Sequence, residues 1–192
     1  FFDAETRGRF LARREAIAAE VGRDWSRAAP VVLYEGLLSD ADMPRVYATA
    51  SHYVSVSHGE GWDQSMTEAA ASGLRLIAPR HSAYLEYLDD STATWLEARL
   101  VPAQAASDPW IGSHFEGQDW WQIDPEALVA LLRQENARPP GIAPTGARAR
   151  MQARYSWPRS ARRLLDLIDE RISQVTPLPD DVVVPPFAIT PP

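Results

Sequence analysis

Residues 52–78 alternate between strand-like and helix-like segments, and this alternation limits the possible folds more than any other feature of the sequence. A short run at residues 52–57 is followed by a glycine-containing turn and by a helix-like run, residues 65–72, which Gly73 ends. Residues 75–78 form the next apolar run. Strands that alternate with helices favour a parallel sheet, so we expect an α/β, Rossmann-like fold with helices on both faces of the sheet.

The flanking segments extend the same pattern. Helices are expected at residues 7–21, 40–50 (capped by Ser39), 83–88, 124–134, 147–155 and 158–175, and further strands at 30–36 and 93–101. Residues 102–122 show no periodicity and predict a long ordered loop, and residues 137–146 predict a linker rich in proline and glycine. We therefore expect one domain over residues 1–175 and a proline-rich C-terminal tail at 176–192.

Composition excludes several classes of function. The absence of cysteine rules out disulfides and thiolate metal sites, and the four histidines lack metal-ligand spacing, so we expect no metal. A net charge of −7 argues against a nucleic-acid partner. No run reaches the ~18 apolar residues of a membrane span, and the first residues do not resemble a signal peptide. All 19 basic residues are arginine, which we attribute to a GC-rich bacterial genome.

Two acidic residues, Glu60 and Glu68, mark the turn and the helix that follow the strand at 52–57. Seven residues separate them. A turn between a strand and a helix N-terminus is where α/β proteins commonly bind anionic ligands. Carboxylates suit such a place when the ligand also carries sugar hydroxyls, because carboxylates accept hydrogen bonds from hydroxyl groups.

The main chain around these acids is suited to bind phosphate. N–H groups near Ser65, Met66 and Thr67 are expected to lack partners within their helix and to be free for a diphosphate oxygen. Gly59 and Gly61 let a ligand approach the backbone closely. Such a local arrangement can hold an anion even in an acidic protein.

Each candidate also has a purely structural interpretation. Residues 65–68 form a capping-box pattern, in which Glu68 caps its own helix, and Glu60 on its own would be a solvated turn acid. His58 is a candidate for a sugar or phosphate contact, or a partly buried strand-end residue. Arg80, next to His81, lies at the ligand-facing end of strand 75–78, or pairs with Glu86 on the surface.

Aromatic residues supply further candidates. Tyr84 could line the site, and three tryptophans could form a carbohydrate-stacking platform or anchor a loop: Trp110, Trp120 and Trp121.

The stretch from Ser57 to Ala78 resembles the Glu-x7-Glu motif of retaining glycosyltransferases of the glycosyltransferase-B fold, the group-1 or family-4 class. The family pattern is roughly S-x-x-E-G-F-G-L-P-x-x-E-A-M-A-x-G-x-P-V-I-A, and this chain reads S-H-G-E-G-W-D-Q-S-M-T-E-A-A-A-S-G-L-R-L-I-A. The departures are Asp63 for Gly, Gln64 for Leu, Ser65 for Pro and Arg75 for Pro. Residues 38–50, 117–128 and 154–161 are similar to three other segments of the family.

The resemblance implies the donor-binding half of a glycosyltransferase-B enzyme, which transfers a sugar from a nucleotide-sugar to an acceptor hydroxyl with retention. It implies that Glu60 faces the donor sugar, as the residue placed closest to the chemistry, and that Glu68 accepts from the ribose hydroxyls. The substrate would be a UDP- or GDP-sugar, with no cofactor, and the acceptor a glycan or a lipid-linked glycan. A paired-carboxylate hydrolase fits less well, because acids beside a helix N-terminus favour binding over general acid work.

The resemblance also implies parts that this sequence does not contain. The first strands of the domain and an N-terminal acceptor domain are expected to lie outside it, and the location would be cytoplasmic, at the inner membrane through that domain. A domain of the same fold that binds a nucleotide-sugar or a protein without turnover is the alternative, favoured by the departures at Asp63 and Gln64. An epimerase would need catalytic acids that the sequence does not reveal.

Overall fold

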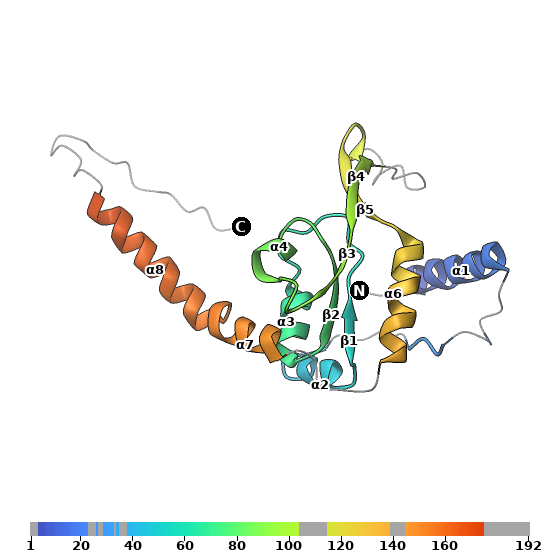
Figure 1. Ribbon diagram of the computed structural model, residues 1–192, viewed down its shortest axis with the longest axis horizontal. Coiled ribbons are helices and arrows are strands. Elements are labelled where there is room, and N and C mark those ends of the chain that lie inside the picture. The colour runs from blue at the N-terminus through green and yellow to red at the C-terminus, as the bar shows by residue number, and fades with distance from the viewer. Residues whose placement is uncertain are drawn as a thin grey trace. The chain divides into compact units, whose positions relative to one another are not determined.

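The structure is a computed structural model that describes residues 4–22, 26, 29–32, 34, 38–103, 115–138 and 145–174 (Figure 1). The chain divides into two units, residues 1–50 and residues 51–192. The expectation of one domain over residues 1–175 stays a prediction, and the tail at 176–192 lies outside the described residues.

The described residues of the first unit include helices α1 (Ala4–Val21) and α2 (Met43–Ala48). Helix α1 ends at Gly22, whose φ of +66° is the left-handed conformation common after helix ends, as the sequence predicted. Helix α2 is shorter than the expected 40–50. Ser39 does not cap it: the Ser39 carbonyl accepts from the Asp42 and Met43 N–H groups, and its hydroxyl donates to the Asp42 carboxylate at 2.6 Å. Ser39 therefore closes a turn that precedes the helix.

The strand expected at residues 30–36 is not present in the part of this segment that the structure describes. Residues 29–32 and 34 belong to no strand, and residues 33, 35 and 36 lie outside the described ranges.

The second unit is built on a three-stranded parallel sheet in the order β1–β2–β3. The strands are β1 (His52–Val54), β2 (Arg75–Pro79) and β3 (Thr94–Leu96). Tyr53 lies opposite Leu76, and Ile77 lies opposite Thr94. Because all three strands are parallel, their carboxyl ends meet at one edge, which is where α/β folds bind ligands.

Helices cover both faces of this sheet, which confirms the expected architecture (Figure 1). Helix α6 (Pro125–Ala137) packs Leu128 and Leu131 against Ile77, Leu96 and Ile123. Helix α3 (Gln64–Ser72) lies on the other side of β2 and buries Met66, Ala69 and Ala70. Asp124 caps α6, because its side chain accepts from the Glu126 N–H.

A buried ionic cluster connects α6 to the amino ends of the strands. The carboxylate of Glu135, 4% exposed, lies 3.3 Å from His52 Nε2, 3.7 Å from Arg75 Nη1 and 2.9 Å from Arg138 Nη1. A carboxylate this deeply buried is retained only with such partners, so the cluster fixes α6 in register with β1 and β2.

The prediction of a long loop at residues 102–122 is wrong in part, because both ends of this segment belong to strands. Strands β4 (Ala98–Pro102) and β5 (Asp119–Ile123) form an antiparallel pair, in which Leu100 lies opposite Trp121. The single strand expected at 93–101 is two strands, β3 and β4, separated at Glu97. The large cross-strand side chains stabilise a pair whose halves are distant in sequence, and residues 104–114 lie outside the described ranges.

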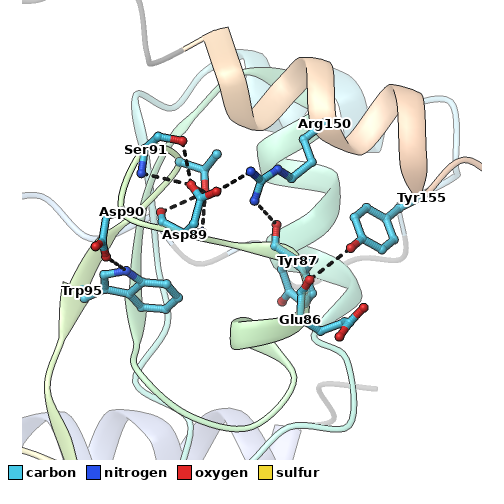
Figure 2. Close-up of polar contacts among 9 residues, drawn as sticks. Glu86, Tyr87, Asp89, Asp90, Ser91, Trp95, Arg150 and Tyr155 are labelled. Atoms are coloured by element: carbon cyan, nitrogen blue, oxygen red, sulfur yellow. Dashed lines mark hydrogen bonds and ion pairs between the residues drawn. The ribbon is translucent and has the colours of Figure 1, made fainter.

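Helices α7 (Thr145–Arg154) and α8 (Trp157–Gln174) follow the predicted positions closely. Figure 2 shows how α7 is fastened to the turn after α4 (Tyr84–Tyr87). Arg150 pairs with the Asp89 carboxylate, and the Tyr155 hydroxyl donates to the Glu86 carbonyl at 3.1 Å. Asp89 also accepts from the Ser91 hydroxyl at 2.6 Å, so one carboxylate joins the turn and the helix.

Helix α8 is strongly amphipathic and leaves its apolar side chains exposed among the described residues. Trp157 is 81% exposed, and Leu164, Leu165, Ile168 and Ile172 are exposed as well. No helix in the described part of the chain has the length and apolar character needed to cross a membrane.

Candidate functional site

The turn between β1 and α3 lies at the carboxyl edge of the sheet, where the sequence predicted the site. A Cβ atom built on Gly59 or Gly61 would meet no described atom within 4 Å, so the main chain of the turn is open to a ligand. Glu60 lies between these glycines and is half-buried.

Two hydrogen bonds and one ring stack hold the turn against β5. The Trp121 N–H donates to the His58 carbonyl at 3.0 Å, and His58 Nδ1 donates to the Trp121 carbonyl at 2.7 Å. The His58 ring stacks on Trp120 with a centroid distance of 4.1 Å. His58 is thus an exposed residue that anchors the turn. Trp120 and Trp121 hold the turn in place, which is the structural role that the sequence analysis gave as the alternative to carbohydrate stacking.

His81 is a buried residue that holds the same turn by a hydrogen bond to Ser57. It is 1% exposed, and its Nε2 donates to the Ser57 carbonyl at 3.0 Å while Nδ1 lies 2.9 Å from the Ser82 hydroxyl. The ring is parallel to that of Trp121, with centroids 5.4 Å apart. Burial lowers the pKa of His81 below its ordinary value, so the neutral ring is favoured in the folded protein.

Asp63 caps helix α3, so Ser65, the first residue of the alternative capping-box pattern at 65–68, lies inside the helix and not at its N-cap. The backbone of Asp63 is left-handed (φ 58°, ψ 77°), and its Oδ1 accepts from the Met66 N–H at 3.0 Å. The Asp63 carbonyl accepts from Met66 and Thr67 at 3.1 and 3.3 Å. The expectation that the N–H groups of Met66 and Thr67 lack partners is therefore wrong, because both are paired with Asp63.

Two tyrosines hold the Asp63 carboxylate in place. The Tyr84 hydroxyl donates to Oδ2 at 2.8 Å and is itself 2.7 Å from the Ser55 hydroxyl, and the Tyr53 hydroxyl lies 3.5 Å from Oδ1. Burial raises the pKa of Tyr84 well above its ordinary range, and the hydrogen bond to Asp63 raises it further. Burial also raises the pKa of Tyr53, and the charges of Asp63 and Glu60 add to this effect.

Glu68 lines a groove of about 610 Å³ between α3 and the α7–α8 segment. Its Oε1 accepts from Gln64 Nε2 at 2.9 Å, one turn earlier on the same helix. Trp62, Tyr155 and Trp157 are the aromatic residues of the groove. Trp62 packs on Tyr155 with ring centroids 5.3 Å apart, and its carbonyl accepts from the Tyr87 hydroxyl at 2.7 Å.

Arg80 forms surface ion pairs, as in the structural alternative, but its partners are not the expected Glu86. Its guanidinium pairs with Asp90 at 2.7 Å and with Glu97 at 3.0 Å, and it lies over the Trp95 ring at 4.9 Å. Both acids are on the protein itself, so this arginine is already charge-compensated. Trp110 and His114 lie outside the described residues.

The structure therefore brings Glu60, Asp63 and Glu68 to one turn and one helix, with Gly59 and Gly61 beside them. Asp63 and Tyr84 are the residues whose roles the sequence analysis missed. An aspartate directly before a helix is itself a capping signal, but the competing S-x-x-E pattern two residues later concealed it. Among the residues described, no three histidine, aspartate or glutamate side chains gather as a metal ligand set.

Comparison with known proteins shows the fold. No protein-family model matches the chain, and no curated protein matches its sequence. The structure is similar to sucrose-phosphate synthase from Thermosynechococcus elongatus, with a TM-score of 0.60 and 19% sequence identity. The likeness covers 90% of this chain but only 35% of that protein's chain. The fold is the Rossmann-like α/β fold of the glycosyltransferase-B type.

Proposed function

We propose that this chain is the donor-binding part of a retaining glycosyltransferase, which binds a nucleotide-sugar at the carboxyl edge of its parallel sheet. The observation that carries the proposal is the position of Glu60, in an open glycine-flanked turn directly before α3, with Glu68 on the same helix facing a groove. The fold likeness to a sugar-transferring enzyme supports the same conclusion.

In this proposal, the two acids bind different parts of the donor. Glu60 accepts hydrogen bonds from the sugar hydroxyls, and Glu68 accepts from the ribose hydroxyls in the groove beside Trp62. Catalysis would be positional and electrostatic, since holding the reactive carbon toward the acceptor removes much of the entropic barrier. The acceptor, a glycan or lipid-linked glycan, would be held by a part of the protein outside this chain.

Calorimetric titration with UDP-glucose and with GDP-mannose tests the proposal. The Glu68→Ala variant should bind its nucleotide-sugar at least about tenfold more weakly, because a charge-assisted hydrogen bond worth ~1.5–3 kcal/mol is lost. Glu86→Ala removes an exposed acid of α4 and is the matched control. The proposal fails if neither nucleotide-sugar binds, or if both variants bind like the wild type.

A binding domain without turnover is the second candidate function, and one observation favours it. The Asp63 carboxylate lies at the α3 N-terminus, where a like charge opposes a leaving diphosphate. Hydrolysis or transfer of a radiolabelled sugar by the protein with its acceptor domain would separate the two candidates, because a pure binding domain releases the donor intact.

A further inference from the structure

We propose that Asp63 is a specificity-determining residue, which occupies the N-terminus of α3 with the protein's own carboxylate and so excludes the donor's diphosphate from it. The inference rests on the proposed function, which places a nucleotide-sugar at this turn. It differs from that function in its consequence: the wild-type chain holds its ligand through hydroxyl groups, and the phosphates contribute little.

The first step is the geometry of the helix end. Asp63 Oδ1 accepts from the Met66 N–H at 3.0 Å, and the Asp63 carbonyl accepts from the same N–H and from that of Thr67. The Met66 N–H is one of the first-turn groups that would otherwise be offered to an anion, whereas the Thr67 N–H makes the ordinary first hydrogen bond within the helix. A phosphate oxygen could reach the Met66 N–H only if the carboxylate moved away.

The second step is that the carboxylate is held where it lies. Oδ2 accepts from the hydroxyl of Tyr84, a residue with 0% exposure, and that hydroxyl is fixed in turn by Ser55. Moving Asp63 would leave a buried tyrosine hydroxyl short of a partner, which is unfavourable. Displacement by a ligand is therefore opposed by the interior of the protein.

The third step is charge. A phosphate group placed at this turn meets Asp63 at close range and Glu60 nearby, and like charges a few ångströms apart near a protein surface repel each other. Arg80 does not offset this, because Asp90 and Glu97 already pair with it. Sugar hydroxyls suffer no such repulsion and find acceptors in both carboxylates.

The test compares four proteins: the wild type, Asp63→Asn, Asp63→Gly and Asp124→Asn. Asparagine keeps the helix cap and tolerates the left-handed backbone while it removes the charge. Glycine removes both charge and cap and suits the φ of 58°. Asp124→Asn makes the same change in net charge at the cap of α6, outside the candidate site, and is the matched control.

Calorimetry with UDP-glucose, GDP-mannose and inorganic pyrophosphate is then run on all four proteins. We expect Asp63→Asn to bind pyrophosphate and its nucleotide-sugar about tenfold more tightly than the wild type, Asp63→Gly to follow the same direction, and Asp124→Asn to change neither affinity. Thermal denaturation of each variant checks that it remains folded.

The outcomes separate this inference from the proposed function. Equal nucleotide-sugar and pyrophosphate affinities in the wild type and Asp63→Asn would overturn the inference and leave the function standing, and so would an equal gain in Asp124→Asn. A gain of pyrophosphate affinity in Asp63→Asn, with no nucleotide-sugar binding to any protein, would overturn the function and support the role of Asp63 at the helix end.

Discussion

At the residue scale, Asp63 combines a helix cap with a backbone conformation that is unfavourable for most side chains. Its φ of 58° is left-handed, and its side chain and carbonyl together accept from the N–H groups of Met66 and Thr67 at the start of α3. Aspartate and asparagine tolerate this region because their short polar side chains bond locally. The family pattern described above has glycine at this position, and glycine adopts the same left-handed backbone readily.

Asp63→Ala should lower the free energy of unfolding by about 1–2 kcal/mol, since it removes the cap and the local hydrogen bonds that offset the cost of a left-handed backbone. Urea denaturation measures this change. Asp63→Asn is the matched comparison and should stay close to the wild type; a similar loss in both variants would mean that the carboxylate charge, and not the cap, stabilises the turn.

His81 makes the stability of the protein depend on pH. Because burial lowers its pKa in the folded state, its contribution to stability is present above the unfolded-state pKa of about 6.5 and is lost as the pH falls. The groups around it are the Ser57 carbonyl, the Ser82 hydroxyl and the Trp121 ring, with His58 opposing its protonation and Glu60 favouring it.

We therefore expect the wild type to lose stability between pH 7.5 and pH 5.5, and His81→Gln to lose less over the same interval. Urea midpoints at the two pH values give the comparison. An equal loss in both proteins would assign the pH dependence to other groups.

At the element scale, α7 depends on the clasp between Arg150 and Asp89 (Figure 2). Asp89 also accepts from Ser91 and Thr92, and the bonds from Ser91 and Arg150 hold the pKa of its carboxyl well below the ordinary range. The clasp fixes one wall of the groove that Glu68 lines, because α7 contributes Met151 and Gln152 to it.

Arg150→Met should therefore lower the free energy of unfolding by about 1–2 kcal/mol, as expected for a partly exposed charge-assisted hydrogen bond. Arg163→Met, on the exposed surface of α8, is the control and should change it by less than about 0.5 kcal/mol. A double-mutant cycle with Asp89→Asn measures the pair itself; a coupling energy near zero would contradict the clasp.

The helices and the strands of the parallel sheet could be predicted from the sequence, because periodicity and local cap or stop residues such as Asp124 and Gly73 define them. The β4–β5 pair could not, since its partners are joined across a long connection and neither strand alternates clearly. Glu60 and the glycines marked the turn of the candidate site in the sequence, whereas the Asp63–Tyr84 contact joins residues 21 positions apart and required the folded structure.

At the scale of the whole molecule, charge works against an anionic ligand. The chain carries a net charge of −7, and Glu60, Asp63 and Glu68 add to the local negative field at the candidate site. A protein that held its donor mainly through cations would bind more weakly as salt increased. The present arrangement predicts the opposite, because salt screens repulsion.

Nucleotide-sugar affinity should accordingly rise, or stay constant, between 50 and 300 mM NaCl. Over this range the screening length, which is ~10 Å at 0.1 M salt, becomes shorter. Titration calorimetry at the two salt concentrations checks this, and Asp63→Asn should show a smaller increase than the wild type. A clear fall in wild-type affinity with salt would indicate that cations outside the described residues dominate binding.

The stacking of His58 on Trp120 gives the candidate site a built-in optical reporter. The two rings are only 4.1 Å apart at the turn that carries Glu60, so the surroundings of the Trp120 indole depend on the position of His58. Any ligand that shifts this turn should change the emission of Trp120. The difference in emission between the wild type and Trp120→Phe would thus follow occupancy of the turn without a label.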